Sequence, residues 1–381
     1  MKKVFCIITM VFCCGLILLA HGQAAWAADD VVMLNFEDIA ARVADYNNTV
    51  RLGKLTLSEA QSALRLALAA NRERREQRSE VKESINETKE MIASGTLDET
   101  QLREAQSLLS TMEQVASSLS TRNTSQLERT IEAVTLQNTQ SLNQLVNGAY
   151  QLFIRAQQLR LSIVLQQSKL EQAEQAVSKA ETRLAHGLGT PAALSEAKLQ
   201  LSSARLELAV MENQARTMLA QLRDYTGYKQ SDVLSLGDMP EVKEGFLAGI
   251  DAESDAEIAV SANFALKLLN IDRLNATATS AKRKIAIQIE QQEAAVRQTV
   301  KQKYESLLET QAKLDLAAAE LQQAEQQLKA AETNFKLGKI AQNALDKQKA
   351  AVEAKYTAWQ NAVLTLAAEI GDYQAKIGGL N

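Results

Sequence analysis

The sequence contains one helical segment twice, and this duplication limits the possible folds more than any other feature. Residues 173–198 and 324–349 align without a gap at an offset of 151 residues, and 10 of the 26 aligned positions are identical. Chance matches between helical segments fall mainly on Ala and Glu, but here a glycine is aligned in the middle, Gly187 with Gly338. The pattern therefore predicts two structural repeats.

The two repeats are unequal in length. A weaker pair of similar segments lies upstream, Asn47–Leu52 and Asn263–Leu268, at an offset of 216 residues. The two offsets differ by 65 residues, so the first repeat carries an additional segment at about 70–135. This segment is rich in charged residues and predicts a charged helical hairpin, although a charge run is usually only a solvated face.

Apolar residues recur every seven positions before both glycines. They are Ala156, Ile163, Leu170, Val177 and Leu184 in the first repeat, and Val300, Leu307, Leu314, Leu321, Leu328 and Phe335 in the second. Sustained heptads indicate a coiled coil. Only 2 Pro, 15 Gly and 4% aromatic residues disfavour an all-β fold, and 46% hydrophobic residues disfavour disorder. The predicted fold is all-α, with long antiparallel coiled-coil hairpins.

Each heptad run stops at its glycine. Glycine adopts the left-handed conformation that closes a helix, and Pro191 suits the first turn of the next one. New helices are predicted at about 192–225 and 341–376. A helix at about 252–279 and a turn near 279–282 are predicted to precede a long helix that starts at about Lys284. Both repeats are therefore predicted to be αα-hairpins with a short glycine tip.

The first residues have the pattern of a secretory signal peptide. Lys2 and Lys3 precede an apolar run, and Ala25-Trp26-Ala27 supplies the small residues of a cleavage site. An uncleaved membrane anchor is the alternative. The predicted organisation is a signal peptide at 1–27, a first helical repeat at 28–225, a Gly- and Pro-containing linker at 226–250 and a second helical repeat at 251–381. We expect an exported protein of the cell envelope.

Several classes of function are disfavoured by the residues present. The chain has 42 basic and 46 acidic residues, so no basic footprint for nucleic acid is visible. All three cysteines lie in the predicted signal peptide, and only His186 remains of the two histidines beyond it. Metal-ligand clusters, phosphate-binding glycine loops and Ser/His/Asp arrangements are absent from the sequence. We therefore predict a protein that is not an enzyme and needs no metal or cofactor.

The arrangement resembles the TolC-type outer membrane efflux family. Leu34–Ile39 followed by Asn47–Val50 is similar to the family's N-terminal motif, although Ile39 and Asn48 depart from it. Asn263–Leu266 resembles the second occurrence of this motif, and the glycine tips resemble the family's periplasmic turns. The resemblance implies a trimeric helical tube in which each protomer contributes two repeats.

The resemblance also has a departure. Membrane strands need about 9–11 residues of alternating pattern, and we find none in this sequence. The expected fold is thus a TolC-like α-barrel protomer that lacks the membrane β-barrel.

By the same resemblance, the function is transport: a helical conduit or docking sleeve for an efflux or secretion machine. The implied partners are further copies of the chain (a trimer if it is TolC-like), a membrane-fusion adaptor and an inner-membrane pump. The implied partner-binding residues lie at the two hairpin tips: Arg183, His186, Gly187, Leu188, Gly189, Thr190, Lys336, Leu337, Gly338, Lys339 and Ile340.

Two other functions remain open on the sequence. A structural coiled-coil scaffold of the cell envelope would explain the missing strands more simply. A periplasmic adaptor of the membrane-fusion type also carries a helical hairpin, but it has flanking β-rich domains that this sequence does not supply.

Overall fold

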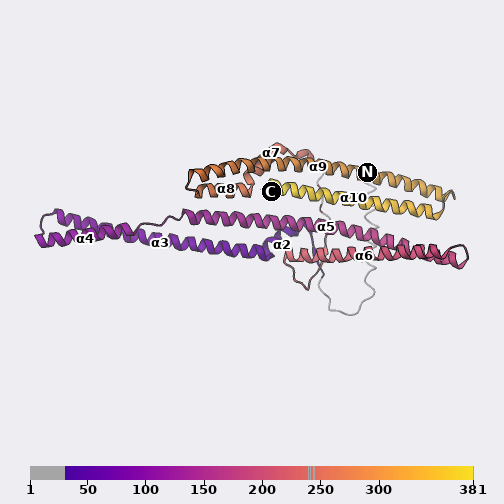
Figure 1. The fold of residues 1–381 in the computed structure, drawn as a ribbon, viewed down its shortest axis with the longest axis horizontal. Coiled ribbons are helices and arrows are strands. Elements are labelled where there is room, and N and C mark those ends of the chain that lie inside the picture. The colour runs from indigo at the N-terminus through magenta and orange to yellow at the C-terminus, as the bar shows by residue number, and fades with distance from the viewer. Residues whose placement is uncertain (1–30, 239, 241, 243–244, 381) are drawn as a thin grey trace.

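The computed structural model of the chain describes residues 31–238, 240, 242 and 245–380. The predicted signal peptide at 1–27 lies outside the described residues. Two long antiparallel hairpins dominate the fold: α5 (Ser125–Ala185) with α6 (Pro191–Thr226), and α9 (Thr279–Lys336) with α10 (Gln342–Ile377). They lie side by side with both tips at the same end (Figure 1). The predicted all-α class with two hairpin repeats is confirmed.

The heptad positions form the contact between the helices of each hairpin. Val300 and Leu307 on α9 and Leu364 on α10 are fully buried, and Leu366 on α10 is nearly so. Small residues occupy the layers nearer the tips, including Ala324 and Ala331 on α9. Small side chains at these positions let the two helices of a hairpin approach closely.

Each long helix is covered by two shorter helices that meet end to end. Asn47 caps α3 (Asn48–Ala93) by accepting a hydrogen bond from Thr49 N at 2.9 Å, and it donates to Tyr225 O, near the end of α6, at 3.1 Å. Asn263 repeats this arrangement. It accepts from Leu266 N at the start of α8 (Phe264–Asn275) at 2.9 Å, and its Nδ2 donates to Gly379 O, just beyond α10, at 3.4 Å.

The prediction of one helix at about 252–279 is wrong. The structure has α7 (Ala252–Ala262) and α8, separated at Asn263. The backbone of Asn263 is extended there, with ψ 122°, because its side chain takes the place of the helical carbonyl as acceptor for the first turn of α8. The predicted turn near 279–282 is also displaced. Residues 276–278 form the connection, and Thr279 already begins α9.

The additional segment of the first repeat is a helical hairpin. The distal half of α3 pairs with α4 (Glu99–Ser118), whose N-terminus has a capping box made by Asp98 and Gln101. Asn71 fixes the base of this hairpin, because its side chain donates to Arg122 O at 2.8 Å and accepts from Arg122 N at 2.9 Å. The hairpin projects beyond the rest of the chain at the end opposite the tips (Figure 1).

A short parallel strand pair was not anticipated from the sequence. β1 (Val31–Leu34) pairs with β2 (Val233–Leu236), which lies in the predicted linker. Leu34 and Leu234 are buried against α2 (Ile39–Tyr46), α5 and α6. Two 3-10 turns, Phe36–Asp38 and Leu247–Gly249, complete the described elements.

The asparagine junctions generate a stability prediction. Replacing Asn47 or Asn263 by Ala removes a helix cap and leaves buried backbone groups without partners, so each should lower the free energy of unfolding by about 1–3 kcal/mol. Denaturant titration followed by circular dichroism measures this. Asn48→Ala is the matched control, because Asn48 is exposed. Equal effects of Asn47→Ala and Asn48→Ala would contradict the role of the junction.

Candidate functional site

The two hairpin tips have the same backbone geometry. Gly187 and Gly338 both have φ 70°, in the left-handed region. At the first tip Leu188 N donates to Arg183 O at 2.8 Å and Gly187 N donates to Leu184 O at 3.0 Å. The second tip repeats both bonds, from Lys339 N to Asn334 O at 2.8 Å and from Gly338 N to Phe335 O at 2.9 Å. This is the Schellman motif, which satisfies the last carbonyls of a helix.

The tips differ in how the next helix starts. At the first tip Thr190 caps α6 by accepting from Ala193 N at 3.2 Å, and Pro191 occupies the first turn. Arg183 closes the same turn by donating to Leu188 O at 3.3 Å. At the second tip α10 follows Ala341, which supplies no side-chain cap. The first tip is therefore held by more side-chain bonds than the second.

The structure brings all of the predicted tip residues to one end of the molecule. Gly189 and Ile340 are half-buried, and the other predicted residues are exposed. Leu188 is 72% exposed and Leu337 is 61% exposed, so each tip presents an apolar side chain to solvent next to cations such as Arg183 and Lys339. A shallow hollow of about 570 Å³ lies beside the first tip, between α5 and α6. Single exposed apolar side chains are common on protein surfaces, so the feature specific to this end is that both tips present one there together.

Polar side chains join the two hairpins. On α5, Gln151 donates to Ala368 O at 3.0 Å and Gln158 donates to Thr365 Oγ1 at 3.0 Å, both on α10. Nearer the tips, Ser168 donates to Glu353 at 2.9 Å. The placement of Gln158 in this seam had no sequence signal, because the identity of the packing partner decides it.

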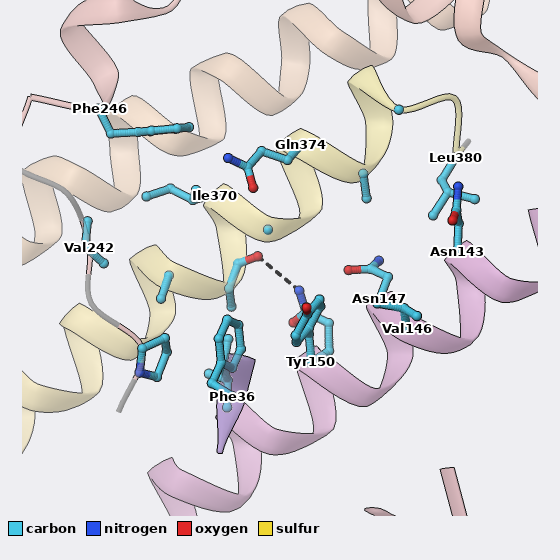
Figure 2. A pocket seen from close by; sticks show the side chains of 18 residues that line it. Phe36, Asn143, Val146, Asn147, Tyr150, Val242, Phe246, Ile370, Gln374 and Leu380 are labelled. Atoms are coloured by element: carbon cyan, nitrogen blue, oxygen red, sulfur yellow. Dashed lines mark hydrogen bonds between the residues drawn. The ribbon is translucent and has the colours of Figure 1, made fainter. Parts of the chain in front are cut away.

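A pocket of about 530 Å³ lies in the same seam, between α5 and α10 (Figure 2). Its described lining includes Phe36, Tyr150 and Ile370 and has no charged side chain. Burial raises the pKa of the Tyr150 hydroxyl above its ordinary value. The pocket is thus a neutral gap beside the hydrogen bond from Gln151 that links the hairpins.

The helices form a row whose two outer edges are apolar. α6 packs on α5, α5 on α10, and α10 on α9. The outer side of α6 exposes Leu199, Leu206 and Val210, and that of α9 exposes Ile287, Leu308 and Leu316. Sequence reasoning missed these edges. The signal was present as the spacing of seven and four residues in Leu199, Leu206 and Val210, which places a second apolar stripe opposite the buried one.

Two kinds of feature were not found in the part of the chain that the structure describes. None of its helices combines the length and the apolar character needed to cross a membrane. Groups of three or more His, Cys, Asp or Glu side chains that could hold a metal ion do not occur among these residues either.

Comparison with known proteins gives a fold but no sequence relative. No protein-family model and no curated protein matches the sequence. Among solved structures, the Campylobacter jejuni CmeC outer membrane channel is similar with a TM-score of 0.55 and 10% identity, over 91% of this chain and 86% of that one. CusC gives 0.55 and 12% over 94% and 96%, and Vibrio cholerae VceC gives 0.53 and 12% over 91% and 97%. The chain shares the fold of these TolC-family outer membrane channels.

The tip glycines generate a second prediction. No atom lies within 4 Å of a Cβ built on Gly187 or Gly338, so only the left-handed backbone opposes substitution. Gly187→Ala and Gly338→Ala should each cost about 1–2 kcal/mol in unfolding free energy. Gly371→Ala, within α10 and equally uncrowded, should be neutral or stabilising. Equal effects at all three positions in denaturant titrations would contradict the tip geometry.

Proposed function

We propose that this protein is an exported component of the cell envelope that forms a helical conduit for an efflux or secretion machine. The observation that carries the proposal is the fold shared with the outer membrane channels CmeC, CusC and VceC, which covers 91–94% of this chain and 86–97% of those three chains. The conduit is a closed ring of identical chains. A trimer is the number that the family resemblance implies.

The exposed apolar edges support an assembly. The outer sides of α6 and α9 present large apolar side chains to solvent, among them Leu206 and Leu316. Covering these edges with further copies of the chain removes apolar surface from water.

The two edges are placed to meet each other. Val210 lies 21 residues beyond Gly189, and Leu316 lies 22 residues before Gly338. At about 1.5 Å per helical residue, both side chains are about 30 Å from their tips, and the tips share one end. Rotation about an axis along the hairpins keeps this height, so the α6 edge of one copy meets the α9 edge of the next. Such a head-to-tail contact closes into a ring.

The hairpin tips are proposed as the docking site for a membrane-fusion adaptor and, through it, an inner-membrane pump. The support is the exposure of Leu188 and Leu337 beside cations at one end of the ring. The remaining alternative, a scaffold without a lumen, leaves the apolar edges of α6 and α9 uncovered in a monomer. It would cover them differently in an antiparallel dimer, where the tips point in opposite directions.

A cysteine pair tests the ring directly. With Cys6, Cys13 and Cys14 replaced by Ser, the chain contains no other cysteine. Val210→Cys combined with Leu316→Cys should then form disulfides between copies under mild oxidation. Denaturing gels should show a ladder that ends at three chains, because a closed ring has no free edge.

Leu206→Cys combined with Leu274→Cys is the matched control. Both side chains are exposed, but α8, which carries Leu274, lies nearer the end opposite the tips than α6, which carries Leu206. We expect the control pair to cross-link weakly. A dimer as the end product of the Val210–Leu316 pair, or cross-links of equal yield in the control, would contradict the ring.

A tip substitution tests docking. Leu188→Glu and Leu337→Glu place a charge where an apolar contact is proposed, and their exposure predicts little effect on folding. Co-purification with a candidate adaptor should fall by at least tenfold, while the mass of the assembly in solution stays unchanged. Leu274→Glu, similarly exposed but far from the tips, is the control. Undiminished co-purification with both tip variants would exclude the tips as the docking site.

A further inference from the structure

The exposed charges on the distal half of α3 are sorted by sign. An acidic strip runs along one side and consists of Glu73, Glu76, Glu80, Glu83, Glu87 and Glu90. A basic strip on another side consists of Arg75, Arg78 and Lys82. All nine side chains are exposed. At about 100° per residue the two strips are centred more than a third of a turn apart, on different flanks of the helix.

Neither strip is neutralised by its own helix. Surface partners on a helix stand three or four residues apart. At these spacings the basic strip has no Asp or Glu, and the acidic strip has one cation, Arg72 next to Glu76. Like charges occupy many of these positions instead, as in Glu76–Glu80 and Arg78–Lys82. Such spacing opposes helix formation, so the arrangement calls for opposite charges from outside the helix.

The rest of the hairpin does not supply them. Residues 114–121, which follow the antiparallel course of the chain past the basic strip, carry no charged side chain. The one ion pair between α3 and α4 among the described residues joins Lys89 to Glu113 at 2.8 Å, and neither of these residues belongs to a strip. Both strips therefore face outward from the hairpin without an ionic partner in the part of the chain that the structure describes.

We infer that the two strips pair between copies of this chain, the acidic strip of one copy against the basic strip of the next. The inference rests on the proposed ring, and it assigns an interface to a segment that the edges on α6 and α9 do not reach. Because both strips lie on the same stretch of α3, rotational symmetry brings them to the same height. Because they lie on different flanks, one helix contacts a neighbour on each side, as a head-to-tail ring requires.

The position of the hairpin places this interface at the end of the molecule opposite the tips. The hairpin projects beyond the start of α5 and beyond the connection between α8 and α9 (Figure 1). At that height each copy contributes only α3 and α4, so the pairing draws the hairpins together at the end opposite the tips. Exposed ion pairs of this kind are screened by salt, and the contact is therefore weaker at high ionic strength than the apolar contact of the edges.

Spin-label distances test the pairing in the full chain. Ser79 is exposed and lies between the strips, so Ser79→Cys, with Cys6, Cys13 and Cys14 replaced by Ser, carries one label per copy. Packed helix axes lie about 8–10 Å apart, and paired hairpins should give a narrow distribution on the order of 20–30 Å. Reversal of the basic strip (Arg75→Glu, Arg78→Glu, Lys82→Glu) should shift it to long, broad distances.

Rescue identifies charge as the cause. Adding Glu76→Lys, Glu80→Lys and Glu83→Lys to the basic-strip reversal restores opposite signs with helix-favouring residues and should restore the short distances. Circular dichroism and mass in solution accompany every variant. Long distances in the wild-type ring, or no rescue, would overturn the pairing and leave the proposed function intact. A monomeric wild-type chain would overturn both the pairing and the proposed function. A particle of six chains with short distances would also overturn the pairing, because the hairpins of two rings would then meet end to end.

Discussion

The fold depends on two asparagine side chains that join helices end to end. α5 and α9 run unbroken for 61 and 58 residues, and each is covered by helices that arrive from opposite directions. Where these helices meet, the first amides of one and the last carbonyls of the other lack helical partners. The side chains of Asn47 and Asn263 each accept a hydrogen bond from a first-turn amide of one helix and donate one to a carbonyl at the end of the other. The two helices remain head to tail, with their dipoles aligned. Without these hydrogen bonds the helices that meet at the junctions would end in buried backbone groups without partners.

The junctions also determine what the chain presents at its surface. They fix α6 and α10 at equivalent places along α5 and α9, so both hairpins reach the same end and both Schellman turns stand there together. They also leave four helices in a row rather than a closed bundle. The apolar outer sides of α6 and α9 follow from their places at the two ends of this row, where α9 has beside it, apart from α10, only the short helices α7 and α8. The exposed tips and the apolar edges, proposed above as docking and assembly surfaces, thus follow from one local arrangement.

Sequence patterns predicted the features that depend only on residues close together along the chain. Heptads and helix-ending glycines act within one or two turns, and the hairpins and tips follow from them. The break at Asn263 carried a local signal too, but its use as a cap between two helices was not recognised. β1 and β2 could not be predicted, because four-residue strands have little pattern and pair across about 200 residues of sequence. The burial of Gln157 could not be predicted either, because its side chain donates to Gly237 O at 2.7 Å, 80 residues further along the chain.

The two ends of the molecule are stabilised by different physical interactions, and this difference bears on how a conduit operates. At the tips, backbone hydrogen bonds fix each turn, and apolar side chains are exposed beside cations, so salt has little effect on the local structure. At the opposite end, the charged hairpin is held at its base by Asn71 and a small apolar core that includes Ile85 and Ala116. Its exposed surface carries the acidic and basic strips of α3. In the proposed conduit, an opening bounded by these strips would respond to ionic strength, whereas the backbone geometry of the tips would not change with salt.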